Sequence, residues 1–225
     1  MSVISPILLS LRIAAIATVL TFLVGLGLAR IFATHRVPLK SIWEALLLLP
    51  LVFPPTITGY LLLVVFGRRG LLGGLLAQAG VQVVFTWAAA VIASFVVSLP
   101  LMYQNCKAAL RAVEPQYAQA ARTLGVSEGR IFRRVTLPIA APGILAGTAL
   151  SFARALGEFG ATLMAAGNIP GRTQTLPLAI YSAVEAGRSA EANLLLGVTV
   201  ALSFILVAVV GWSERRVFFP GRDGR

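Results

Sequence analysis

Long apolar stretches separated by short polar connections dominate this chain. Five of them, at about 7–33, 42–66, 81–106, 139–166 and 194–212, are long enough to cross a membrane core, which takes about 20 helical residues. Apolar residues make up 58% of the chain and charged residues only 12%, whereas about a quarter of a soluble domain is charged. The pattern therefore predicts an all-α, polytopic membrane protein with about five transmembrane helices.

Prolines interrupt the second apolar stretch. Pro50, Pro54 and Pro55 all fall within it. A proline inside a helix lacks a backbone N–H, so the helix bends or breaks and the freed carbonyls need other partners. We therefore expect a kinked or broken helix here, which serves either packing or a transport pathway.

Two connections are apolar but unsuited to spanning a membrane. Residues 67–80 are rich in glycine and contain two leucine pairs, which predicts a short helix at the membrane interface. Residues 173–188 are only moderately apolar and include Glu185, which predicts a helix outside the membrane.

A polar and basic segment, residues 119–138, lies between the third and fourth apolar stretches. Its first part predicts a short amphipathic helix over 113–124, because four side chains recur at the spacing of one helix face. These are Tyr117, Ala120, Ala121 and Leu124. The two alanines leave that face flat, so a partner could approach the backbone closely.

A glycine separates this helix from a second one. Gly125 follows the last periodic residue and predicts the left-handed conformation that ends a helix. Ser127 is then expected to cap a second short helix that ends near Arg134. The pattern alone leaves two interpretations open: the helices lie on the lipid interface, or they present a surface to a partner.

Seven positions of this segment share a recognisable spacing: Gln119, Ala120, Ala121, Gly125, Val135, Leu137 and Pro138. The spacing resembles the cytoplasmic signature of ATP-binding-cassette (ABC) importer permeases, which reads Glu-Ala-Ala, three residues, Gly, nine residues, Ile-x-Leu-Pro. Valine for isoleucine is conservative, whereas Gln119 removes a negative charge. The resemblance implies a coupling helix that docks into a cleft of a separate ATPase subunit.

The fourth apolar stretch contains two opposite charges. Arg154 and Glu158 are one helical turn apart. At ~1.5 Å per residue, Arg154 lies about 24 Å along a helix from Pro138, past the middle of an apolar core of about 30 Å. The pair either compensates itself near the outer interface or lines an aqueous path and helps to gate it.

The sequence after this pair extends the resemblance. GEFGAT begins at Gly157 and is followed by NIPG and by TLPLAIY, which ends at Tyr181. These runs, together with LPLVFPPTITGYLLL and GRRG earlier in the chain, are similar to permeases for tetrahedral oxyanions, and most of all to those for molybdate. The resemblance implies a type I ABC importer transmembrane domain over 7–212, followed by a short basic cytoplasmic tail over 213–225.

The same resemblance implies partners, and the sequence as a whole predicts residues of a translocation path. The expected partners are a second copy of this chain, cytoplasmic ATPase subunits and an extracytoplasmic oxyanion-binding protein. The residues expected along the translocation path or at its gate are Arg154, Glu158, Asn168, Pro54 and Pro55. Within the same family, sulfate, thiosulfate or tungstate are alternative substrates. A different class, a membrane anchor or assembly subunit without transport, is a second alternative.

Placement of the basic residues predicts the orientation. The net charge of +11 could indicate nucleic-acid binding, but basic side chains in a membrane protein usually gather on the cytoplasmic side. With five spans, most of them fall on one side: Arg30, Arg36, Lys40, Lys107, Arg111, Arg122, Arg130, Arg133, Arg134, Arg215, Arg216, Arg222 and Arg225. We therefore expect no nucleic-acid partner. We expect a multi-pass protein of the bacterial or archaeal cytoplasmic membrane, with its N-terminus outside the cell and its C-terminus in the cytoplasm.

Several kinds of chemistry find no support in the sequence. The nucleotide-binding motif G-x-x-x-x-G-K-[ST] does not occur, and no hydrolytic constellation is apparent. One cysteine, Cys106, and one histidine, His35, do not make a disulfide or a protein-only metal site. The sequence predicts a protein that moves a substrate, has no enzymatic activity and needs no cofactor.

Overall fold

The computed structural model describes residues 4–34 and 37–218, and within these ranges it is helical and contains no strand. The first half contains α1 (Ile4–Thr34), α2 (Lys40–Val52), α3 (Pro55–Phe66), α4 (Leu71–Gln78) and α5 (Trp87–Arg111). The second half contains α6 (Pro115–Thr123), α7 (Glu128–Ile131), the π-helical turn η1 (Phe132–Thr136), α8 (Leu137–Leu156), α9 (Gly160–Ala166), α10 (Leu176–Glu185) and α11 (Ser189–Phe218).

The predicted all-α membrane architecture is confirmed. Among the described residues, four helical segments are long and apolar enough to cross a membrane: α1, α5, the continuous run from α7 to α8, and α11. The fifth candidate is α2 together with α3, which meet at an angle of 115°.

The sharp bend between α2 and α3 comes from the two adjacent prolines. A residue before proline avoids the helical conformation, so both Phe53 and Pro54 are extended, with ψ of 141° and 135°. Pro55 then starts α3 at the position where a missing N–H costs nothing. Pro50 lies inside α2 without ending it. The predicted interruption is therefore a break at Pro54, and not a gentle kink.

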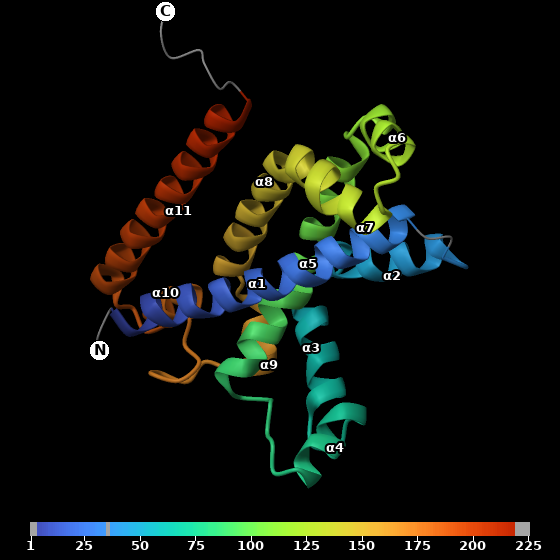
Figure 1. Cartoon of the computed structure of the whole chain (residues 1–225). Coiled ribbons are helices and arrows are strands. Elements are labelled where there is room, and N and C mark those ends of the chain that lie inside the picture. The colour runs from blue at the N-terminus through green and yellow to red at the C-terminus, as the bar shows by residue number, and fades with distance from the viewer. Residues whose placement is uncertain (1–3, 35–36, 219–225) are drawn as a thin grey trace, which may run out of the picture.

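Helices α1, α5 and α8 form the centre of the molecule, and α1 runs from the N-terminus to the α6–α7 region (Figure 1). Small residues bring the backbones together. A β-carbon on Gly25 of α1 would lie 2.9 Å from Met102 Cγ of α5, and one on Gly143 of α8 would lie 2.8 Å from Ala109 Cβ. Close approach through small residues is how helices pack in a membrane, where lipid competes with apolar contacts.

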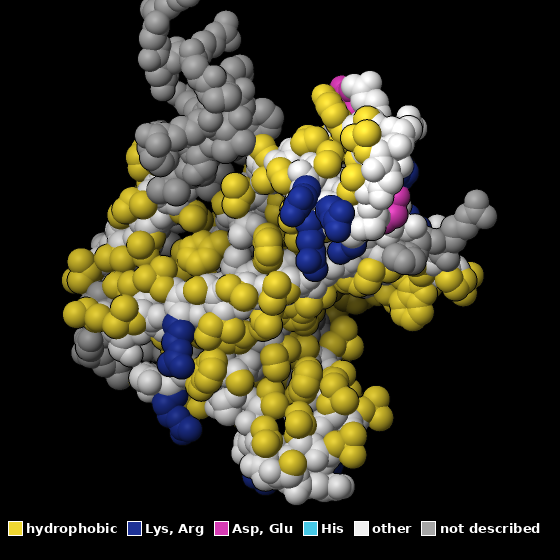
Figure 2. All heavy atoms as spheres, in the orientation of Figure 1, with side chains coloured by type: hydrophobic (Ala, Val, Ile, Leu, Met, Phe, Trp, Pro, Cys, Tyr) yellow, Lys and Arg dark blue, Asp and Glu magenta, His cyan; other side chains and the backbone are white. Residues whose placement is uncertain are grey.

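The outer surface is largely apolar, as Figure 2 shows for one face. Helix α11 lies at one side of the molecule, where its main packing partners among the described residues are α10 and α8 (Figure 1). Its Val200, Phe204 and Ile205 side chains are 59%, 75% and 59% exposed. Such exposure suits a helix that faces lipid or another membrane chain.

The fourth predicted helix, 139–166, is wrong as a single element. Helix α8 ends at Leu156, residues 157–159 leave the helical path, and α9 begins at Gly160. Phe159 adopts φ −123° and ψ −60°, and the Glu158 carboxylate accepts a hydrogen bond from the Ala161 N–H of α9 at 2.8 Å. The break therefore has its own capping group, which the apolar pattern does not reveal.

Two other boundaries differ from the predictions. The third span begins at Trp87, and not near 81, because Phe85 is left-handed (φ 61°) and Thr86 is extended; it continues past Cys106 to Arg111. The last helix continues past residue 212 to Phe218, and the remainder of the predicted tail, 219–225, lies outside the described residues.

The two short connecting helices form as predicted. Helix α4 exposes Leu71 and Leu75, and its place at a membrane interface stays a prediction. Helix α10 buries Leu176 and Leu178, and the Leu176 N–H donates to Ser10 Oγ of α1 at 2.7 Å. Helix α10 is therefore fixed against the N-terminal half of α1, while its position relative to the membrane stays a prediction.

A glycine substitution tests the contact between α3 and α9. A β-carbon on Gly59 would lie 2.8 Å from Ala161 Cα and 2.9 Å from its carbonyl oxygen, so Gly59→Ala must push backbone apart. We expect a loss of about 1–3 kcal/mol of stability, measured as a lower melting temperature of the purified protein. Gly27→Ala on α1 is the control, because apart from its chain neighbours and the nearby backbone of α1 no described heavy atom lies within 4 Å of a β-carbon placed there. An equal effect of the two substitutions would contradict the tight α3–α9 contact.

Candidate functional sites

Helices α6 and α7 form a protruding tip, residues 115–131, at one end of the molecule (Figure 1). We call it the α6–α7 tip. The turn between its helices is a Schellman motif: the Gly125 N–H donates to Arg122 O at 2.9 Å and the Val126 N–H donates to Ala121 O at 3.2 Å. Gly125 has φ +73°, so the predicted left-handed glycine is confirmed.

The α6–α7 tip presents an apolar surface outside the core. None of the nine residues described in α6 is buried. Leu124 is 81% exposed and Tyr117 is 47% exposed, and Gln119 and Ala120 are also exposed. An apolar side chain at the end of a polar helix pair suits a protein-binding surface.

An ion pair joins the two helices of the tip. Arg122 donates to both Glu128 oxygens, from Nε at 2.5 Å and from an η-nitrogen at 3.1 Å. The Arg122 guanidinium lowers the pKa of the Glu128 carboxyl below its usual value. Both side chains are exposed, so the pair fixes the geometry of the turn more than it adds stability.

The second short helix differs from the prediction. Ser127 occupies the capping position, but its side chain makes no capping hydrogen bond in the described structure. The helix does not end near Arg134, because η1 carries the chain without a break into α8. The tip is therefore joined to a spanning helix without a break.

The structure divides the seven signature positions into two groups. Gln119, Ala120, Ala121 and Gly125 belong to the tip, whereas Val135, Leu137 and Pro138 form the junction with α8. At this junction Phe132 and Leu137 pack against the core cluster that contains Ala29 of α1 and Cys106 of α5. The junction thus connects the tip to α1, α5 and α8 at once.

A single substitution tests whether glutamine at position 119, where the permease signature has glutamate, changes function. Gln119 is exposed and its side chain forms no hydrogen bond within the described structure, so Gln119→Glu has no contact to break. On the expectation that the chain is an importer permease, this variant should keep the uptake of the unsubstituted protein. A large loss would mean that the charge at this position affects the partner.

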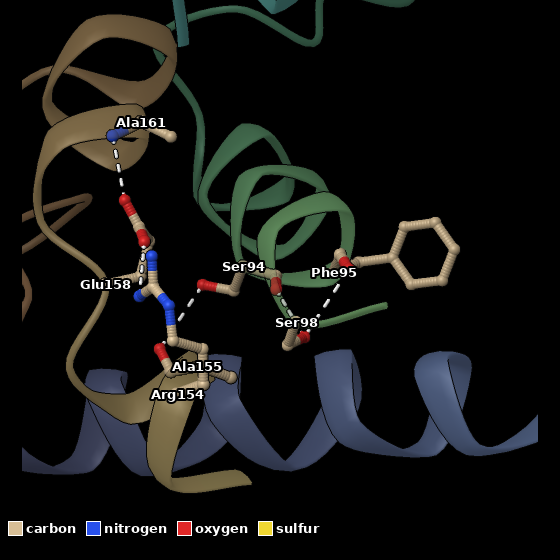
Figure 3. A network of polar contacts seen from close by, with 7 residues as sticks. All are labelled: Ser94, Phe95, Ser98, Arg154, Ala155, Glu158 and Ala161. Carbon is tan, nitrogen blue, oxygen red and sulfur yellow. Dashed lines mark hydrogen bonds and ion pairs between the residues drawn. The ribbon is translucent and has the colours of Figure 1, made fainter. Parts of the chain in front are cut away.

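The second candidate site surrounds the break between α8 and α9 (Figure 3). Arg154 Nη1 donates to Glu158 Oε2 at 2.8 Å, while Glu158 Oε1 accepts the Ala161 N–H. The Glu158 side chain is 1% exposed and that of Arg154 is 33% exposed. The predicted pair therefore forms, with the carboxylate buried and the guanidinium reaching the surface.

Both chain breaks meet at this site. A β-carbon on Gly160, the first residue of α9, would lie 2.9 Å from Cβ of Pro55, the first residue of α3. The structure thus brings Pro54 and Pro55 close to the break that follows the Arg154–Glu158 pair. We call this region the double break.

Asn168 lies apart from the double break, at the other end of α9. It donates to Ser182 Oγ of α10 at 2.5 Å and accepts from Gln174 Nε2 at 3.0 Å. Thr173 Oγ1 also donates to Gly167 O at 3.0 Å. Asn168 orders the loop between α9 and α10, and a place for it in a gate stays a prediction.

Buried hydroxyls near the double break escaped the sequence prediction. Thr58 of α3, Ser151 of α8 and Thr162 of α9 are buried, and their hydroxyl oxygens have no partner among the described residues. Serine and threonine in helices usually bond to their own preceding turn, as Thr18 does with Ala14 O at 2.7 Å. The sequence does not distinguish a hydroxyl that bonds to its preceding turn from one that has no partner.

A polar contact between α2 and α5 was also missed. Glu44 Oε1 accepts from Tyr103 OH at 2.6 Å and from Lys107 Nζ at 2.7 Å. The presence of acidic Glu44 within the second apolar stretch could have indicated a polar contact with another helix. Across the described residues, no group of three His, Cys, Asp or Glu side chains could hold a metal ion.

Fold and sites together define a helical membrane protein that has an exposed, protruding tip at one end and a charged double break among its spanning helices. Residues 21–219 match the family described as binding-protein-dependent transport system inner membrane component. The chain belongs to this family.

Curated relatives share most of their length with this chain. The molybdenum transport system permease protein ModB of Escherichia coli K12 is 42% identical over 212 residues, which cover 93% of this chain and 92% of that protein. The protein of that name in Haemophilus influenzae is 40% identical, with 95% and 94% covered. The sulfate transport system permease protein CysT of Salmonella typhimurium is 33% identical, with 92% and 75% covered.

Solved structures share the fold. An inward-facing structure of the MetNI methionine ABC transporter superposes with a TM-score of 0.78 at 18% identity, covering 96% of this chain and 99% of that one. A bacterial alginate ABC transporter, in complex with its alginate pentasaccharide-bound periplasmic protein, gives 0.74 at 15% identity, covering 95% and 78%.

Proposed function

We propose that this chain is the membrane-spanning permease of a molybdate importer. The observation that carries the proposal is the 42% identity to a molybdenum-transport permease along nearly the whole length of both chains. The exposed α6–α7 tip supports it, because a permease without a nucleotide-binding motif needs a separate ATPase and a surface on which to receive it.

The proposed assembly contains two copies of this chain, two cytoplasmic ATPase subunits and an extracytoplasmic oxyanion-binding protein. The chain has no ATPase activity of its own. Its N-terminus lies outside, and the α6–α7 tip and the C-terminal tail at 213–225 lie on the cytoplasmic side, following the placement of basic residues. Residues 7–212 form the transport domain.

ATP binding in this assembly closes the ATPase subunits and moves the α6–α7 tip. The tip is continuous with α8 through η1, so α8 moves with it. The far end of α8 carries Arg154 at the double break, where Gly160 of α9 packs against Pro55 of α3. ATP at one end and the loaded binding protein at the other then select between inward-open and outward-open states.

The double break suits the passage of an oxyanion. Arg154 is partly exposed and has guanidinium donors beyond the one that binds Glu158, so it offers a local positive charge to an anion. The buried Glu158 compensates this charge. The opposite charges of Arg154 and Glu158 favour weak, brief contact with the anion. A tight binding site would slow its release.

Transport by the reconstituted complex tests the proposal. Vesicles that contain this chain, its ATPase and its binding protein are expected to take up labelled molybdate only with ATP. Unlabelled tungstate should compete and excess sulfate should not. Efficient competition by sulfate would instead assign the chain to sulfate or thiosulfate transport, an alternative that the relative named for sulfate transport supports.

An anchoring or assembly subunit is the alternative of another class. It predicts a complex that assembles with the ATPase yet takes up no oxyanion with ATP. The double break favours transport over anchoring, because a simple anchor needs neither a bent spanning helix nor a buried ion pair.

A further inference from the structure

A cavity of about 670 Å³ lies where the α6–α7 tip meets the end of α1. Its walls include Arg30 of α1, Leu110 of α5, Arg122 of α6 and Phe132 of η1. This volume falls within the ~300–1,000 Å³ that small-molecule sites usually have. The proposed transport mechanism does not use this space.

Arg30 gives the cavity an unpaired positive charge. Its guanidinium carbon lies 4.1 Å from the centre of the Phe132 ring, and its side chain forms no ion pair or hydrogen bond within the described structure. Stacking on a ring leaves the edges of a guanidinium, and therefore its donors, available. Arg122 across the cavity is already held by Glu128.

Basic and apolar residues follow or precede the lining residues of the cavity along η1 and α1. Arg133 and Arg134 of η1 are exposed and form no ion pair within the described residues. Basic side chains gather beside α7 on the face shown in Figure 2, next to apolar side chains. Ile31 and Leu23 of α1 are 46% and 61% exposed. A ligand with an anionic head and an apolar tail matches this arrangement.

We propose that the cavity binds the phosphate head group of an anionic phospholipid, whose acyl chains follow the exposed apolar residues of α1. A soluble anion would leave that apolar surface unused, whereas a lipid satisfies both parts. Clusters of basic residues at the ends of spanning helices attract anionic lipids. The bound lipid would hold α1 against η1 and so make the response to the ATPase depend on lipid composition.

Lipid binding by the full-length chain tests this proposal without any transport assay. The purified protein is incubated with phosphatidylglycerol, and native mass spectrometry counts the lipids retained. We expect Arg30→Gln to reduce the binding constant by about fivefold, the effect of one basic residue near a membrane surface. Arg12→Gln is the matched control, because Arg12 also lies on α1 and stacks on an aromatic ring, that of Trp87, at 4.8 Å. It should bind lipid like the wild type.

Two further measurements separate the outcomes. Arg30→Lys keeps the charge and should bind more phosphatidylglycerol than Arg30→Gln; equal binding by these two variants would contradict a charge-based site. Phosphatidylcholine should not displace the bound lipid. Undiminished binding by Arg30→Gln would overturn the proposal, and displacement of the lipid by inorganic phosphate alone would replace it with a soluble-anion site.

Discussion

Replacing Gly125 by valine should lower ATP-driven uptake by at least about tenfold, since left-handed backbone costs ~1–2 kcal/mol for residues with a β-carbon and more for β-branched ones. Gly125 has φ +73° and closes the Schellman turn. Apart from Gly125 and its chain neighbours, no described heavy atom lies within 4 Å of a β-carbon built on it, so the effect comes from the backbone and not from a clash. Uptake in vesicles and the amount of inserted protein are the measurements.

Asparagine at the same position is the matched control. It tolerates the left-handed conformation better than other residues with a β-carbon, so Gly125→Asn should retain much of the uptake. Valine should leave insertion into the membrane intact, because the turn lies outside the core. Normal transport by Gly125→Val would show that the geometry of the α6–α7 tip does not matter for coupling.

Replacing Arg154 by alanine should destabilise the protein more than replacing Glu158 by glutamine. Arg154→Ala leaves the buried Glu158 carboxylate without its cation, a situation that costs about 3–5 kcal/mol for a fully buried pair and less here because Arg154 is partly exposed. The expected result is a melting temperature lower by roughly 5 to 10 °C.

Glu158→Gln keeps an acceptor for the Ala161 N–H and removes the buried charge, so its effect should be smaller. The double variant, Arg154→Ala with Glu158→Gln, should recover part of the stability lost in Arg154→Ala. A double variant less stable than Arg154→Ala alone would mean that the pair is not coupled as the structure indicates. Uptake by the stable variants then tests whether the pair also affects transport.

The hydrophobic pattern predicted most of the fold, because a chain that crosses a membrane must form its backbone hydrogen bonds within long apolar helices. The bend at Pro54 and the turn at Gly125 were also predictable, since proline and glycine act through local backbone sterics. The break after Leu156 was not predicted, because the apolar stretch resumes beyond Gly160 and the apolar pattern does not reveal the hydrogen bond from the Ala161 N–H to Glu158.

For the candidate sites, too, the sequence predicted local features but not the contacts between distant segments. The sequence placed the seven signature positions in one segment, and the structure separates an exposed tip from a packed junction. Pro55 and Gly160 are far apart in the chain, so only the fold brings the two breaks together. Asn168 was expected along the path or at its gate, and this stays a prediction; its contacts with Ser182 and Gln174 become visible only in the fold.

The claim that the α6–α7 tip is the cytoplasmic docking surface can be tested by cysteine labelling. The single native cysteine, Cys106, is buried, so Leu124→Cys introduces an accessible thiol on the tip. Arg172→Cys, exposed in the loop between α9 and α10, is the control for the opposite end. A membrane-impermeant maleimide should label Leu124→Cys only in inside-out vesicles, and bound ATPase should protect it, whereas Arg172→Cys should be labelled only from the outside. Labelling of Leu124→Cys from outside the cell, or no protection by the ATPase, would contradict the account.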